Sequence, residues 1–99
     1  MNKFDAERGF AERMKKNYPV GTRIALDHMD DPYEPVPPGT RGTVAYVDDM
    51  GQIGMNWDNG RTLSLIPGED SFHRLSAQEI AEEQQMNEMQ DQGIEMKMQ

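Results

Sequence analysis

The chain has 99 residues, enough for one small domain, of which 28% are charged and 35% hydrophobic. It contains no cysteine, which excludes a disulfide framework and a thiolate zinc site. No stretch approaches the roughly 20 apolar residues that cross a bilayer, and the first ten residues lack the apolar segment of a signal peptide. We therefore expect a soluble cytoplasmic protein.

The net charge of -8 is unevenly spread along the chain. Residues 1–17 carry a charge of +2, whereas 18–75 and 76–99 carry -5 each. An acidic domain repels phosphate backbones at long range, so this distribution disfavours non-specific nucleic-acid binding.

The first segment, 1–17, is predicted to be an amphipathic helix. Ala6, Phe10 and Met14 recur every four residues, and charged residues occupy the other faces. Pro19 prevents the helix from continuing. We expect the helix to dock on the following domain through Phe10 and Met14.

From residue 18 to residue 75 the hydrophobic period is two, which predicts short antiparallel strands. The strands are expected around Ile24 and Leu26, at 40–47, at 53–57, around Leu63 and Leu65, and at 72–75. A long loop, two tight turns and a single helical turn at 67–71 connect them. This order predicts a mainly β domain, a small five-stranded SH3-like barrel.

Three features specify the connections between these strands. Prolines at 32, 35, 37 and 38 make 27–39 a long, stiffened loop. Asn59-Gly60 between two alternating segments predicts a two-residue type I′ hairpin, and Gly42 predicts a bulge or close packing. The expected core is Ile24, Leu26, Val44, Ile53, Met55, Trp57, Leu63, Leu65, Phe72 and Leu75.

The last segment, 76–99, is an acidic, Met- and Gln-rich tail. Ser76 and Glu79 have the spacing of a capping box, so a second helix should begin there. After Glu83 no apolar stripe continues, and we expect the rest to be frayed or disordered. The alternative is a Met-rich contact surface that becomes ordered on a partner.

Several short motifs within 18–75 occur together at a specific spacing. They are Asp30-Asp31-Pro32, Pro37-Pro38-Gly39-Thr40, Gly42-Thr43-Val44, Trp57-Asp58-Asn59-Gly60 and Ile66-Pro67-Gly68. On these motifs the segment resembles the small SH3-like bacterial domain of unknown function 4314, which is common in mobile elements and has no assigned activity. Residues 39–44 are also similar to the signature of KOW domains, which implies RNA or ribosome-associated partners. The stretch from Gly42 to Gly60 is similar to mind-bomb/HERC domains, which implies recognition of protein tails.

Catalytic and metal-binding patterns are not found. The acids of the long loop, Asp27, Asp30, Asp31 and Glu34, lack the spacing of a calcium loop. His28 and His73 have no cysteine partners for zinc, and no serine has the context of a nucleophile. We therefore expect no enzyme activity, no catalytic residue, no metal and no cofactor.

Exposed aromatics and acids suggest a binding surface instead. The expected partner-binding residues are Tyr33, Asp30, Asp31, Glu34 and Tyr46, and the acids favour a protein or peptide with a basic segment. The alternative is a nucleic-acid-associated, KOW-like module with contacts at Arg23, Arg41, Arg61 and Arg74. A third hypothesis is a purely structural spacer between the helix and the tail.

Overall fold

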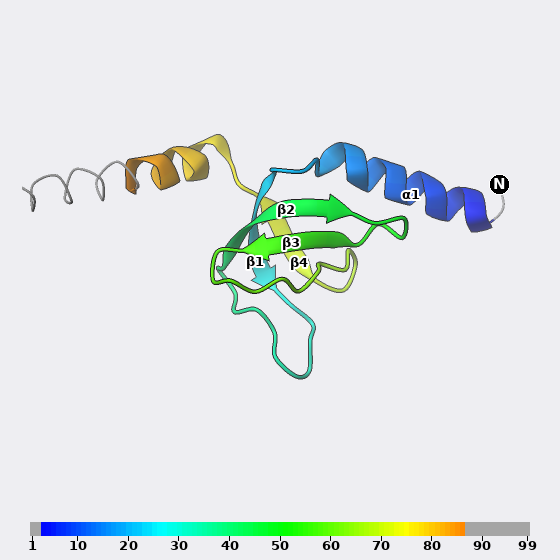
Figure 1. Ribbon diagram of the computed structural model, residues 1–99, viewed down its shortest axis with the longest axis horizontal. Coiled ribbons are helices and arrows are strands. Elements are labelled where there is room, and N and C mark those ends of the chain that lie inside the picture. The colour runs from blue at the N-terminus through cyan, green and yellow to red at the C-terminus, as the bar shows by residue number, and fades with distance from the viewer. Residues whose placement is uncertain (1–2, 87–99) are drawn as a thin grey trace, which may run out of the picture.

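The computed structural model describes residues 3–86, with side chains from Arg8 onward, as two helices and four strands (Figure 1). The elements in chain order are α1 (Lys3–Asn17), β1 (Arg23–His28), β2 (Arg41–Val47), β3 (Ile53–Trp57), β4 (Ser71–Arg74) and a helix over 77–86. The frayed or disordered segment expected after Glu83 lies largely in 87–99, outside the described residues.

The four strands form one antiparallel sheet in the order β3-β2-β1-β4. Val44 of β2 is opposite Met55 of β3, and Leu26 of β1 is opposite Phe72 of β4. Irregularities near Val44 and Leu26 bend the two outer pairs, as β-bulges do. The prediction of a mainly β domain is confirmed.

The expected fourth strand around Leu63 and Leu65 is reduced to one bridge. Leu65 exchanges two backbone hydrogen bonds with Ile53, at 2.9 and 2.8 Å. The carbonyl oxygen of Leu63 accepts a hydrogen bond from the indole Nε1 of Trp57 at 2.8 Å. Within residues 3–86 there are therefore four strands rather than five, and no pairing of β3 with β4 closes the sheet.

The turn after β3 is not the predicted type I′ hairpin. Among the described residues no residue other than glycine has a positive φ, so Asn59 does not meet the type I′ requirement, whereas Gly60 has φ 90°. Gly60 N–H donates to the carbonyl of Trp57, and Trp57 N–H donates to that of Arg61, each at 2.9 Å. The side-chain oxygen of Asn59 accepts the N–H of Arg61 at 3.0 Å. The connection is a three-residue loop that ends in a left-handed glycine.

The hydrophobic core includes most of the expected residues together with two from the proline-rich loop. Its members are Met14, Ile24, Leu26, Met29, Val36, Val44, Ile53, Met55, Trp57 and Leu65. Leu63 and Phe72 are only partly buried against it. Gly42 lies in close contact with Trp57, since a Cβ there would be 2.7 Å from the indole ring. Sequence reasoning missed Met29 and Val36 because they stand among prolines and acids with no strand period.

Helix α1 docks through the two side chains that were predicted to hold it. Met14 is 8% exposed and belongs to the core, and Phe10 packs against the same cluster. Gly51, in the turn between β2 and β3, lies directly against the Phe10 ring and has φ 85°. A side chain at this position would displace the ring, so the glycine is required for the helix to approach the turn.

Candidate functional site

The proline-rich loop between β1 and β2 is fixed along its length by backbone hydrogen bonds. Val36 is fully buried, and its N–H donates to the sulfur of Met29 at 3.3 Å. Gly39 N–H donates to the carbonyl of Leu26 at 2.7 Å, which closes the base of the loop. The Arg61 guanidinium donates to the carbonyl oxygens of Glu34 and Pro35. The loop is therefore held in one shape before any ligand binds.

Asp70 joins this loop to the turn that precedes β4. Its side chain is buried, and its two carboxylate oxygens accept the N–H groups of Asp30 and Ile66, each at 2.8 Å. A buried carboxylate with both oxygens bonded to backbone N–H groups holds two segments together. Sequence reasoning missed this role. The available signal was an aspartate at the end of a Pro-Gly turn, where aspartates often bond nearby backbone groups.

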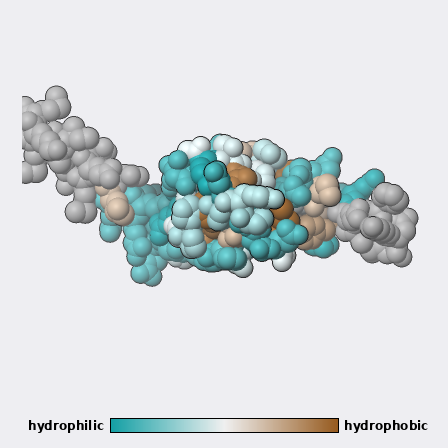
Figure 2. Space-filling view, turned by 90° about the horizontal axis from the view of Figure 1, so that it is seen from below, coloured by the Kyte–Doolittle hydropathy of each residue, from teal (hydrophilic) through white to brown (hydrophobic). Residues whose placement is uncertain are grey.

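A hollow of about 260 Å³ lies between these two segments. Met29, Leu63 and Ile66 provide apolar lining, and Asp30 and Asp31 are two of its acidic lining residues. Pro32, Tyr33, Ser64 and Asp70 complete the lining. Figure 2 views the molecule from below, the side toward which the loop projects in Figure 1, and shows small hydrophobic areas within a largely hydrophilic surface. The hollow is smaller than a typical small-molecule binding site.

The structure brings most of the predicted partner-binding residues to this hollow. Tyr33 is 89% exposed, and its N–H donates to Asp31 Oδ1 at 2.8 Å, which orients the residue. Asp30 lines the same hollow, and Glu34 follows Tyr33 at the exposed end of the loop. Tyr46 lies elsewhere, beside Gly54 and a second hollow shared with Tyr18, Pro19 and Val20. Four of the five residues thus lie on one loop, whereas Tyr46 belongs to a different surface.

The four arginines of the alternative prediction occupy three separate places, each with partners within the chain. Arg61 holds the proline-rich loop, and Arg74 donates to the carbonyl of Asn17 at 3.2 Å. Arg23 and Arg41 lie close together, where they contact carboxylates of helix 77–86. The four arginines therefore do not form a single cluster.

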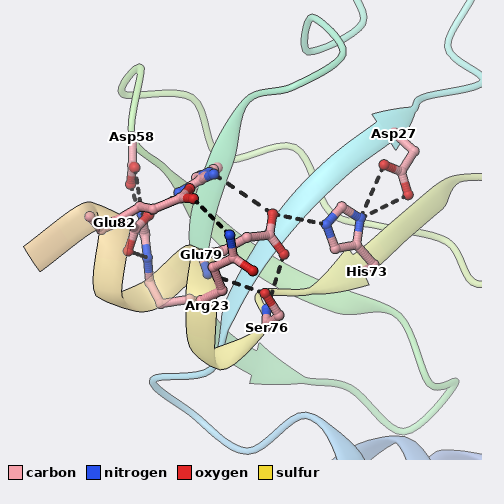
Figure 3. Close-up of polar contacts among 10 residues, drawn as sticks. Arg23, Asp27, Asp58, His73, Ser76, Glu79 and Glu82 are labelled. Carbon is pink, nitrogen blue, oxygen red and sulfur yellow. Dashed lines mark hydrogen bonds and ion pairs between the residues drawn. The ribbon is translucent and has the colours of Figure 1, made fainter.

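Arg23 is the centre of a charge network (Figure 3). Its guanidinium forms a two-pronged pair with Asp58, at 2.8 and 2.7 Å, and contacts Glu83 at 2.7 Å and Thr43 at 3.0 Å. The hydrogen bonds to Asp58 and then to Glu83 raise the pKa of Arg23, and in return Arg23 lowers the pKa values of both carboxyl groups. Arg41 extends the network to Glu83 at 3.3 Å and to Glu79 at 3.7 Å.

His73 is at the other end of this network. Its Nδ1 lies 3.1 Å from both oxygens of Asp27, and its Nε2 lies 3.3 Å from Glu79 Oε2. Asp27, followed by Glu79, raises the pKa of His73. Glu79 also makes the predicted capping box, since Ser76 N–H donates to Glu79 Oε1 and Glu79 N–H donates to Ser76 Oγ, at 3.0 and 3.1 Å.

Residues 3–86 contain no group of three or more His, Cys, Asp or Glu side chains placed to hold a metal ion. Neither described helix is long and apolar enough to cross a membrane.

Comparison with known proteins gives one family. The model described as "Domain of unknown function (DUF4314)" matches residues 7–75. The match begins inside α1, earlier than the 18–75 of the predicted resemblance, in agreement with the packing of Phe10 and Met14 against the core. No curated protein gives a significant match to the chain.

Proposed function

The chain belongs to the DUF4314 domain family, and we propose that it is a non-catalytic interaction module that binds a basic protein segment. The observation that carries the proposal is the hollow between the proline-rich loop and the turn at 66–70. Its apolar lining residues, the acidic residues Asp30 and Asp31 and the exposed Tyr33 suit the stem and the charged head of one Lys or Arg side chain.

The loop favours binding because its backbone is already ordered in the absence of a ligand. Four prolines limit its backbone, the buried side chains of Met29 and Val36 anchor it, and Arg61 and Asp70 hold its backbone groups. A segment that is already ordered loses less conformational entropy when it binds a ligand. Tyr33 therefore offers a large contact area from a fixed support.

The charge of the site favours a basic partner. Asp30, Asp31 and Glu34 lie on one loop, and the whole chain carries a charge of -8. Complementary charge at this loop speeds the encounter with a basic segment. A phosphate-binding surface would be expected to carry positive charge instead.

A titration of the isotopically labelled full chain with a Lys/Arg-rich peptide tests the proposal. We expect amide shifts at 29–34 and 63–66, and affinity that weakens as salt increases. Tyr33→Ala should weaken binding about fivefold or more, the loss of at least about 1 kcal/mol that marks an anchor residue. Asp31→Asn should also weaken binding, because it removes charge while it keeps the oxygen that accepts the Tyr33 N–H.

Asp49→Asn is the matched control, since it removes the same charge from a fully exposed carboxylate in the turn between β2 and β3. If Asp31→Asn and Asp49→Asn weaken binding equally, the binding depends on overall charge and not on the hollow. A short RNA that shifts Arg23, Arg41 and Arg61, with no peptide response near Tyr33, would contradict the proposal and support the nucleic-acid alternative.

We also infer a relationship between this sheet and SH3-like barrels. The sheet has the strand order β3-β2-β1-β4, and Leu65 extends it beyond β3 through its bridge to Ile53. The resulting spatial order, with the 65 region next to β3 and β4 next to β1, is the meander expected of a five-segment barrel. A long loop after β1 and a short turn before β4 agree with that arrangement.

A further inference from the structure

Helix 77–86 is held on the sheet by charged contacts. Glu79 and Glu83 are four residues apart, on one helix face, and reach Arg23 of β1, Arg41 of β2 and His73 of β4. No residue of helix 77–86 belongs to the hydrophobic core, and Ile80 of this helix is 38% exposed. Retention of the helix therefore depends on these carboxylates more than on apolar burial.

Arg23, Arg41 and His73, which we name the cationic strip, are arranged to receive two carboxylates one helical turn apart. Arg23 directs all five of its N–H groups at Asp58, Glu83 and Thr43. Arg41 lies between the two glutamates, and His73 meets Glu79. Charge-assisted bonds of this kind set the geometry of the bound group as well as its charge.

Two aspartates limit the strip at its ends. Asp58 pairs with Arg23 at one end, and Asp27 pairs with His73 at the other (Figure 3). A continuous phosphate backbone laid along the strip would meet these carboxylates, whereas a helix with two acids four residues apart fits between them. The strip is therefore better suited to an acidic helix than to a nucleic acid.

The family match separates the strip from the helix that covers it. All three cationic residues lie within the matched segment 7–75, while helix 77–86 follows it. The three cationic residues thus lie within the matched domain, whereas helix 77–86, which covers them, follows the domain in sequence.

We propose that the cationic strip is a docking surface for an acidic α-helix with carboxylates at positions i and i+4, and that helix 77–86 occupies it in cis. A partner helix must displace a tethered competitor, whose short connection gives it a high effective concentration. Access of the partner is therefore controlled by release of the chain's own helix. This surface is separate from the hollow beside Tyr33 and makes no use of it.

The test uses the isotopically labelled full chain carrying E79Q and E83Q, together with a peptide of the native sequence of residues 76–86. The double variant should bind this peptide at least fivefold more tightly than the unaltered chain, with amide shifts at Arg23, Arg41 and His73. A matched peptide with glutamine at the two glutamate positions should cause no such shifts. Hydrogen exchange at 77–86 should accelerate in the double variant, since its own helix is released.

Charge reversal supplies a second measurement if the double variant folds poorly. R41E in the otherwise unaltered chain should accelerate exchange at 77–86 at least fivefold, because it places a carboxylate against Glu79 and Glu83. Unchanged exchange in both R41E and the double variant would overturn the proposal, as would equal binding of the acidic and glutamine peptides. Amide shifts of the cationic strip with a short RNA but not with the acidic peptide would contradict the proposal and indicate that the ligand is a nucleic acid.

Discussion

At the scale of single residues, the side chains that determine the shape of the candidate site are polar and bond to the backbone. Asp70 and Arg61 each bind two backbone groups of segments distant in sequence or across a turn. Tyr33, in contrast, is exposed to the solvent, and Asp31 is half-buried beside it, where it accepts the Tyr33 N–H. The residues that support the site are therefore distinct from those proposed to bind the ligand.

Asp70→Asn should destabilise the domain by about 1–3 kcal/mol, because one of the two part-buried backbone N–H groups bonded to Asp70 would then face an amide N–H₂ instead of an acceptor. Urea unfolding of the full chain, followed by circular dichroism, measures the change in the free energy of unfolding. Glu69→Gln, at the exposed neighbouring position, should alter it by less than about 0.5 kcal/mol. Equal values for the two variants would show that Asp70 does not join the loop to the turn.

At the scale of elements, helix 77–86 differs from α1 in the physical basis of its attachment. Helix α1 buries Met14 and packs Phe10 against the core, so its docking depends on apolar area. Helix 77–86 is attached through Glu79 and Glu83, so its docking depends on ionisation. The two helices should therefore respond differently to salt and to pH.

The docking of helix 77–86 should be strongest between about pH 4.5 and pH 6.5, the ordinary values of the groups involved. The pKa of Glu79 is lowered, first by the Ser76 backbone and then by His73, and that of Glu83 is lowered by Arg23. Their contribution is present above pH 4.5 and is lost as the pH falls through the lowered values. The pKa of His73 is raised, so its contribution is present below pH 6.5 and is lost as the pH rises through the raised value.

Amide shifts of 77–86 recorded across this range measure the docking, and high salt should weaken it. H73Q should remove the loss on the alkaline side, and on the acid side the loss should begin at a higher pH, because His73 no longer lowers the pKa of Glu79. The effect should be small, because His73 is about half exposed and surface pairs contribute little. A docking profile that is the same with and without His73 would exclude its participation.

At the scale of the whole molecule, stability depends on a core assembled from parts that are distant in sequence. The core takes Met14 from α1 and Met29 and Val36 from the proline-rich loop, in addition to residues from β1, β2, β3 and Leu65. A small domain buries a modest fraction of its surface, so each of these contributions matters. The domain therefore includes part of α1, as the family match from residue 7 indicates.

Met14→Ala should lower the free energy of unfolding of the full chain by about 2–4 kcal/mol, since it removes a buried methionine from the core. Lys16→Ala on the exposed face of the same helix is the control, and it should leave stability nearly unchanged. Thermal or urea unfolding distinguishes the two variants. Similar stability of both would mean that α1 is not part of the cooperative unit.

Local patterns in the sequence were sufficient for much of the fold. Alternation at Ile53, Met55 and Trp57 predicted β3, and the Ser76–Glu79 spacing predicted the start of the last helix, because strand and capping signals act over a few residues. Tyr33, Asp30 and Asp31 were identified as candidates because a proline-rich loop cannot bury them easily.

The tertiary structure decided what depends on contacts between distant segments. Leu63 lies outside any strand, with its carbonyl bonded to the Trp57 indole, and Val36 entered the core although its neighbours are prolines. Tyr46 was separated from Tyr33, and Arg23 and Arg41 were placed under Glu79 and Glu83. Hydrophobic period and turn propensity describe neighbours along the chain, whereas these pairings depend on which backbone and charged groups the folded sheet brings within bonding distance.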